Sequence, residues 1–292
     1  MPSGLQVFNE SGVELFDSNL VQYGLLKAGY LTFTTWWPWY YLRSAQLDPN
    51  DQDNYAPEDP PKSPIWTISV TGAINPVAFC AGQAILTGQS GVSGGTYTFY
   101  FQSVVGNPKI YIFDLMRDMG TGVGMQVFNE SGVLTFTSEM PALNIVGTAM
   151  PEPPAAGFQW GNEMRWGQPY GPLTSGAYMN DRSYYYDPNR ERPVGWDEAF
   201  SQPYNPTGAA EIAVRLTFSR ACGVIGRAGA TSGVEGCVGG SVARFAFMQS
   251  AFSTWNFLNS SGSGGDVYVG IPTDRYPTMQ IIDTSHYPFP FN

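Results

Sequence analysis

The chain has 292 residues and a formal net charge of −10, with 24 acidic residues against 14 lysines and arginines. Nucleic acids and anionic membranes bind clustered Lys and Arg, so this balance argues against both kinds of partner. Aromatic residues reach 15%, charged residues only 13%, and the chain contains 34 glycines and 23 prolines. This composition is typical of short strands joined by elaborate loops, and no long segment shows helical periodicity. We therefore expect an all-β protein.

The termini and cysteines indicate where the protein is made. Met1-Pro2-Ser3-Gly4 lacks the basic start and apolar core of a secretory signal. No run of about 18 apolar residues is present to insert into a membrane. Cys80, Cys222 and Cys237 are odd in number and widely spaced, which fits neither a disulfide framework nor a zinc site. We expect three free thiols in a soluble protein made in a reducing compartment.

One short sequence occurs twice. Residues 4–13 read GLQVFNESGV and residues 124–133 read GMQVFNESGV, and through residues 18 and 138 eleven of fifteen positions are identical. Each copy predicts a strand, a tight turn and a return strand, in which Asn bonds its own backbone and Gly12 takes positive φ. A spacing of 120 residues is close to the size of a domain. We expect two β-sandwich-like domains, residues 1–119 and 120–292, each opened by this hairpin.

Alternating apolar residues predict further strands in chain order. In the first unit they fall at residues 65–70, 96–105 and 109–114. In the second unit they fall at residues 211–218, 242–248, 267–271 and 278–282. Residues 223–240 are so rich in glycine that a loop is expected there. The return strands of the two hairpins differ, with Glu14-Leu15 replaced by Leu134-Thr135, which predicts different neighbours for the two copies.

Two aromatic-rich loops are the candidate interaction surface. The first contains three tryptophans around Pro38, and the second is the long insertion 151–206, where four arginines are interleaved among eleven aromatic residues. Tyr, Trp and Arg dominate binding hot spots because they bury much area at small entropic cost. The alternative is that these rings only cover the sandwich. The candidate residues are Trp36, Trp37, Trp39, Trp160, Trp166, Tyr184, Tyr185, Tyr186, Arg190, Arg192 and Trp196.

Catalytic and metal sites have little support in the sequence. His286 is the single histidine, and its neighbours Asp283-Thr284-Ser285 are no evidence for a triad, because fold geometry builds triads. The acids of the insertion could form a glycosidase pair, but no spacing selects one. Residues 48–59 resemble a calcium loop without its glycine and its terminal glutamate. We expect no enzyme activity, no catalytic residue, no metal and no cofactor.

The repeated hairpin, GLQVFNESGVELFDS in its first copy, resembles the opening of small β-rich virion proteins of tailed-bacteriophage tail tips and tail fibres. The segment KIYIFD at residues 109–114, followed by a Gly-containing linker and the second copy, is also similar to that family. The resemblance implies a structural tail component that acts in tail assembly and host attachment, in the virion, after assembly in the host bacterial cytoplasm. It implies that the chain forms a homo-oligomer with three-fold symmetry and binds other tail proteins. A host glycan or receptor is a further implied partner. The alternative is a carbohydrate-binding module or glycan depolymerase of the virion.

Overall fold

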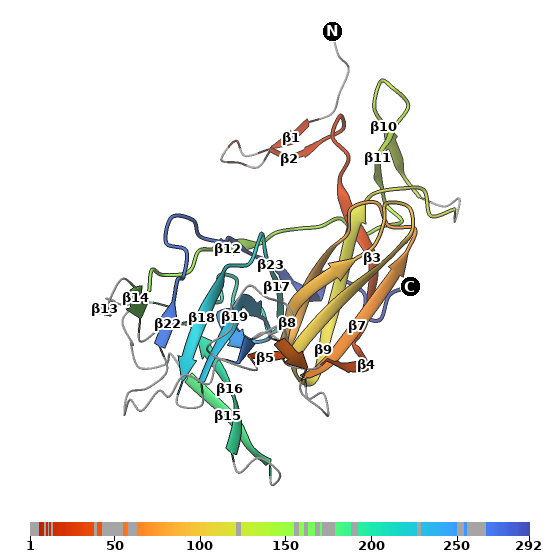
Figure 1. Cartoon of the computed structure of the whole chain (residues 1–292). Helices are drawn as coiled ribbons and strands as arrows, with labels where there is room; N and C mark the ends of the chain where they lie inside the picture. The colour runs from red at the N-terminus through yellow and green to blue at the C-terminus, as the bar shows by residue number, and fades with distance from the viewer. Residues whose placement is uncertain are drawn as a thin grey trace.

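The computed structural model describes residues 6–8, 10, 12, 14–37, 40–42, 55–57, 63–120, 124–154, 158–160, 163–166, 170, 179–187, 192–201, 203–226, 229–249, 254–255 and 267–292. These residues form sheets that are antiparallel except for one parallel pairing, between β5 and β21, together with one short 3-10 helix, η2 (Thr284–His286), so the all-β prediction is confirmed. Two eight-stranded sheets make up the body, and two short hairpins project from it at one end (Figure 1).

The first sheet has the strand order β12-β23-β17-β8-β9-β7-β4, and β3 pairs with β9 beside this path. Its strands are β3 (Tyr23–Tyr30), β4 (Thr32–Trp37), β7 (Ser63–Thr71), β8 (Val77–Ser90), β9 (Thr96–Leu115), β12 (Gly147–Ala149), β17 (Ile212–Leu216) and β23 (Met279–Asp283). Strands from both sides of the expected domain boundary thus share one sheet. The division into residues 1–119 and 120–292 stays a prediction.

Strands β8 and β9 bend together, so the first sheet curves over its own core. Residues 109–115 of β9 pair with β3, whereas residues 96–101 pair with β7, and β8 follows β9 through both halves. Register shifts interrupt the β8–β9 pairing, and Gly82 and Gly106 there have φ of +115° and +68°. Bulges and glycines of this kind bend strands. The strands expected at 96–105 and 109–114 are therefore one long strand.

The alternation of side chains along these strands creates two apolar faces. On one face Cys80 and Ile112 join a cluster with Phe99 and Phe101. On the other face Phe79, Tyr111 and Phe113 lie under the C-terminal segment. Tyr287 packs against Phe113 with ring centroids 5.0 Å apart, and residues 28 and 291 exchange two backbone hydrogen bonds. The C-terminus thereby covers an apolar face that would otherwise meet water.

The second sheet has the order β13-β14-β22-β18-β19-β20-β16-β15. Its strands are β13 (Phe158–Trp160), β14 (Glu163–Trp166), β15 (Met179–Asp187), β16 (Arg192–Phe200), β18 (Ala221–Gly226), β19 (Gly229–Val238), β20 (Arg244–Gln249) and β22 (Val267–Val269). The insertion 151–206 therefore supplies strands to a sheet where a long loop was expected. A smaller sheet joins β5 (Tyr40–Leu42), β6 (Tyr55–Pro57) and β21 (Thr254–Trp255).

The glycines at residues 223–240 have a different role from the one expected. The loop prediction is wrong, because β18 and β19 form a hairpin here. A Cβ on Gly236 would lie 2.4 Å from Ile85 Cγ2, and one on Gly239 would lie 2.5 Å from the backbone oxygen of Cys80. Glycine is present because the two sheets approach too closely for a side chain. The shared core beside this contact includes Ile212 and Ile281 from one sheet and Phe245 and Phe247 from the other.

The two copies of the repeated sequence adopt the same local fold. Strands β1 (Gln6–Phe8) and β2 (Glu14–Asp17) pair with the same register and the same bulge as β10 (Gln126–Phe128) and β11 (Leu134–Thr137). Gly12 and Gly132 have φ of +80° and +74°, as the turn requires. The Asn129 side chain accepts hydrogen bonds from the backbone N–H groups of Ser131 and Val133. The hairpin prediction is confirmed.

The close approach of the sheets can be tested at Gly239. We expect Gly239→Ala to lower the free energy of unfolding by about 1–3 kcal/mol, because the new methyl group meets backbone oxygens that cannot rotate away. Gly88→Ala is the control, since a Cβ there would lie 3.8 Å from Tyr100, in ordinary contact. This control should change stability by less than about 0.5 kcal/mol. Urea unfolding of both variants gives the comparison, and equal stability would contradict the steric argument.

Candidate interaction surface

Strand β4 is an open sheet edge whose side chains face water. It pairs with β7 on one side and ends the strand order of the first sheet within the described structure. Residues 32–36 are all exposed. Protein edges are usually protected by charges, proline or a covering segment, because unpaired backbone groups attract further strands. Strand β4 reads TFTTWW, so its own sequence supplies neither a charge nor a proline to protect this edge.

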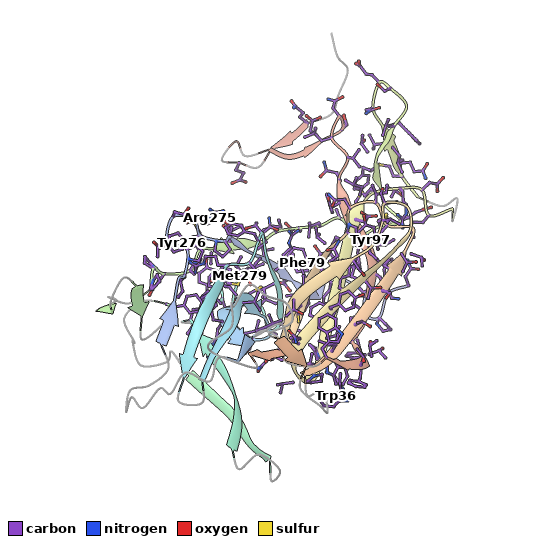
Figure 2. The ribbon with its side chains drawn as sticks, viewed as in Figure 1. Trp36, Phe79, Tyr97, Arg275, Tyr276 and Met279 are labelled. Carbon is purple, nitrogen blue, oxygen red and sulfur yellow. The ribbon has the colours of Figure 1, made fainter. Side chains whose placement is uncertain are left out.

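Aromatic rings gather along this edge. The Phe33 ring lies 5.6 Å from Trp36 and 5.7 Å from Trp66, measured between centroids, and Trp37 lies 5.8 Å from Tyr100. Phe33 and Trp36 keep 40% and 49% of their surface exposed, and Figure 2 shows Trp36 at the end of the view opposite the hairpins. We call Phe33, Trp36, Trp37, Trp66 and Tyr100 the β4 edge cluster.

A bulge explains how Phe33 and Trp36 meet. Residues three apart on a regular strand point to opposite faces, since side chains alternate. The pairing of β4 with β7 shifts register between Phe33 and Thr35, which places the two rings on one side. The Thr34 and Thr67 hydroxyls, 2.7 Å apart, hold the strands together at this point. On one face of the sheet Phe33 therefore supports Trp36 and Trp66, while Trp37 and Tyr100 pair on the other face.

The predicted surface residues divide into three groups. Trp36 and Trp37 belong to the β4 edge cluster, but on a strand and not in the expected loop. Strands β13–β16 carry seven more, of which only the backbone is described: Trp160, Trp166, Tyr184, Tyr185, Tyr186, Arg192 and Trp196. Trp39 and Arg190 lie outside the described residues, as does most of the calcium-like segment 48–59. Interaction and glycan-stacking roles for these residues stay predictions.

Sequence reasoning missed three members of the β4 edge cluster. Phe33, Trp66 and Tyr100 come from strands β4, β7 and β9, and cross-strand pairing brings them together. The available signal was the uncharged, threonine- and aromatic-rich run of residues 32–37, which has the composition of a strand. The tryptophans around Pro38 suggested a loop instead.

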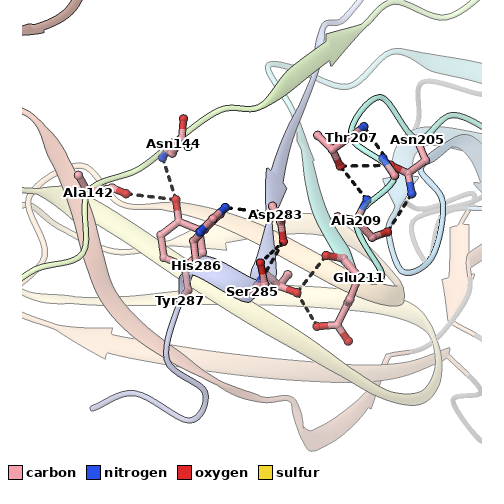
Figure 3. Close-up of polar contacts among 12 residues, drawn as sticks. Ala142, Asn144, Asn205, Thr207, Ala209, Glu211, Asp283, Ser285, His286 and Tyr287 are labelled. Carbon is pink, nitrogen blue, oxygen red and sulfur yellow. Dashed lines mark hydrogen bonds and ion pairs between the residues drawn. The ribbon is translucent and has the colours of Figure 1, made fainter. Parts of the chain in front are cut away.

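His286 belongs to a capping arrangement at the start of η2. Asp283 Oδ1 accepts hydrogen bonds from the backbone N–H and the hydroxyl of Ser285, at 2.9 and 2.7 Å (Figure 3). His286 Nε2 lies 3.8 Å from the other oxygen of Asp283. The hydrogen bonds from the Ser285 hydroxyl and from its backbone N–H lower the pKa of Asp283 below its usual value. A catalytic triad needs the histidine between serine and acid, whereas here the acid lies between serine and histidine.

Glu211 ties the C-terminal segment to β9. Its carboxylate accepts hydrogen bonds from Lys109 Nζ, 3.0 Å from each oxygen, and from the Thr284 hydroxyl at 2.8 Å. Figure 3 shows Glu211 close to Ser285 and apart from the turn at Asn205. All partners of Glu211 in this contact are protein groups that fasten one segment to another, which is a structural role.

The three cysteines are free and buried, which confirms the thiol prediction. Burial raises the pKa of Cys80 and of Cys222 to about 12, and that of Cys237 well above its usual 9.0. Only thiolates are effective nucleophiles and metal ligands. These thiols are therefore chemically inert at neutral pH in the folded protein.

A buried ionic network joins Glu235 of strand β19 to residues outside the strands. Arg220 donates to both oxygens of Glu235, at 2.7 and 2.8 Å, and to the carbonyl of Pro272 at 3.0 Å. The Tyr170 hydroxyl donates to Glu235 at 3.0 Å, and burial together with that carboxylate raises the pKa of Tyr170 well above 10. The side chains of Arg220 and Glu235 have no exposed surface. The network holds a charge pair away from water and offers no group to a substrate.

Within the described structure, no group of three or more His, Cys, Asp or Glu side chains could hold a metal ion. No helix in the described part of the chain is long and apolar enough to cross a membrane. Comparisons with protein-family models, curated proteins and solved structures found no match. Among the described residues, the surface best suited to contact with another protein is the β4 edge cluster, which exposes Phe33 and Trp36 at the end of a sheet.

The buried thiols predict a loss of stability at high pH. The folded state keeps these protons up to about pH 12, while an unfolded thiol ionises near 9.0. Stability is therefore fully present below pH 9 and is lost as pH rises from 9 toward 12. Each thiol contributes a slope of up to about 1.4 kcal/mol per pH unit in this window. Urea unfolding at several pH values measures how steeply stability falls with pH. Cys80→Ala should make this fall less steep by the contribution of one thiol, and an unchanged slope would show that Cys80 does not contribute to it.

A double-mutant cycle tests the buried ion pair. We expect Arg220→Met to cost about 3–5 kcal/mol of stability, because it leaves the Glu235 carboxylate buried without its cation. The double variant Arg220→Met/Glu235→Leu should cost less than the sum of the two single changes, since no lone charge remains buried. Chemical denaturation measures all three variants. Additive losses would show that the two side chains do not depend on each other.

Proposed function

We propose that this chain is a non-enzymatic structural component of a bacteriophage tail tip or tail fibre that contributes to tail assembly and host attachment. The exposed β4 edge cluster carries the proposal. Large uncovered apolar patches are rare on proteins that act alone, and an open edge strand is a template for strand addition by a partner. The sequence resemblance of the repeated hairpin supplies the tail setting.

The β4 edge suits one kind of partner best. Its backbone groups can pair with an extended segment, and Phe33 and Trp36 offer rings already held by their neighbours. We assign this edge to a β-strand of a neighbouring tail protein with apolar side chains. Backbone pairing would give affinity and the ring contacts would give specificity. The buried thiols and the Asp283 cap support a structural role, since each is used inside the fold.

Location in the particle tests the proposal directly. Purified virions labelled with antibody against this chain should carry gold at the tail tip or fibres in electron micrographs. Label confined to the head, or absent from particles of a phage that encodes this chain, would overturn the tail assignment.

The role of β4 is tested by a matched pair of variants. Phe33→Glu should lower incorporation of the chain into virions at least about tenfold, because a carboxylate in the cluster must be desolvated when a partner strand docks. Phe218→Glu is the control, since Phe218 is also 40% exposed but contributes no ring to the cluster. Circular dichroism should show that both variants keep the fold. Immunoblots of purified particles give the readout, and equal incorporation would exclude β4 as the contact.

A further inference from the structure

A pocket lies between the two large sheets, where β12 ends the strand order of the first sheet. Its volume is about 290 Å³, at the small end of the range for ligand sites. Residues 148–152, at the end of β12 and just after it, form one wall. Ser201, Pro203 and Tyr204, which follow β16 of the second sheet, form the other wall. Strands β12 and β4 are opposite ends of one strand order, so this pocket is separate from the β4 edge cluster.

Backbone hydrogen bonds fix both walls of the pocket. The Ser201 N–H donates to the Phe245 carbonyl at 2.9 Å, and Tyr204 and Ala243 exchange two hydrogen bonds of 2.8 and 2.7 Å. On the other side β12 pairs with β23, and Ala149 lies opposite Met279. The pocket is therefore built by sheet pairing and is already formed without a ligand.

The interior of the pocket is apolar, and its hydroxyl groups already have partners. Met279 has no exposed surface, and Phe245 and Tyr170 are buried. The Tyr170 hydroxyl donates to Glu235 at 3.0 Å, and the Ser201 hydroxyl oxygen accepts the Phe245 N–H at 2.9 Å. The deepest part of the pocket therefore suits an apolar group of a ligand.

The outer part of the pocket favours a positive charge. Among the described residues that line it, Glu152 is the only charged one, and its exposed side chain has no hydrogen bond or ion pair with another described residue. Tyr204 keeps 40% of its surface exposed in the same pocket. A carboxylate and an aromatic face both attract cations. The net charge of −10 adds to this attraction at longer range.

We propose that this pocket binds a hydrophobic ammonium, which is an apolar group of about the size of a side chain with a protonated amine next to it. The apolar group fills the interior over Met279 and Phe245, and the ammonium lies in the outer part with Glu152 and Tyr204. A free organic amine and the amino terminus of another polypeptide share this chemistry. The site does not rest on the proposed tail function, because it has no residue in common with the β4 edge cluster.

Titration of the full chain, with carbon-13 in its methionine methyl groups, tests the site at about pH 6.5, where both amines are protonated. 2-Phenylethylamine represents the free amine, and phenylalanyl-glycinamide represents the amino terminus of a chain. At least one of them should shift the methyl signals of Met150 and Met279, which line the pocket, at up to about 20 mM. Tighter binding of the amine would assign the site to a small molecule, and tighter binding of the dipeptide would assign it to a polypeptide terminus.

A neutral probe and two variants separate the charge from the apolar group. 2-Phenylethanol has the same ring without the ammonium and should bind at least about threefold more weakly than the amine. Glu152→Gln should weaken binding of the amine by a similar factor and leave binding of the alcohol unchanged. Asp274→Asn is the control, since Asp274 is also exposed but does not line the pocket, and it should change neither affinity.

Three results would each overturn the proposal. The first is that neither amine shifts the methyl signals of Met150 and Met279. The second is equal affinity of the wild-type protein for 2-phenylethylamine and 2-phenylethanol, which would show that the pocket does not recognise the charge. The third is a Glu152→Gln variant that binds the amine as tightly as the Asp274→Asn variant does.

Discussion

The close packing of β19 against β8 and β17 is the constraint on which the structure depends. At Gly236 and Gly239 the two sheets approach to a distance at which a single methyl group would collide with a neighbour. This contact brings Ile212 and Ile281 against Phe245 and Phe247, so two sheets that would each expose an apolar face share one core. Since the inner faces cover each other, sheet edges and projecting hairpins are among the surfaces that the described residues expose.

The sequence predicted those parts of the fold whose signal is local. The repeated hairpins were found from the turn residues, and strands β7, β17 and β23 from alternating side chains. Strand β8, which reads VAFCAGQAILTGQS, was missed because small and polar residues interrupt its alternation. Those residues suit a bent strand buried on both sides, and burial on both sides depends on partners far away in sequence. The hairpin β18–β19 was missed because its glycines look like loop residues in the sequence. Gly236 and Gly239 are required by close packing against the other sheet, whose residues are far away in the sequence.

The candidate site was predictable only in part. The sequence predicted Trp36 and Trp37 as interaction residues. The rings that complete the cluster, Trp66 beside Phe33 and Tyr100 beside Trp37, come from other strands, and the bulge at Phe33 is a property of the pairing. His286, Asp283 and Ser285 are adjacent in sequence, and only coordinates show that the acid caps a helix and lies between the other two. Residue types indicate what chemistry is possible, while strand register decides which groups meet.

Charge and ring chemistry are distributed differently between the interior and the surface of this molecule. The Arg220–Glu235 ion pair is buried and is joined by Tyr170 and the Pro272 carbonyl, so it is used inside the fold. The β4 edge cluster and the face of the second hairpin instead expose apolar groups beside open backbone edges. Backbone pairing tolerates many sequences, so specificity at such edges must come from the rings and from register. The bulge at Phe33 sets this register in β4 and so decides which rings lie on the same face.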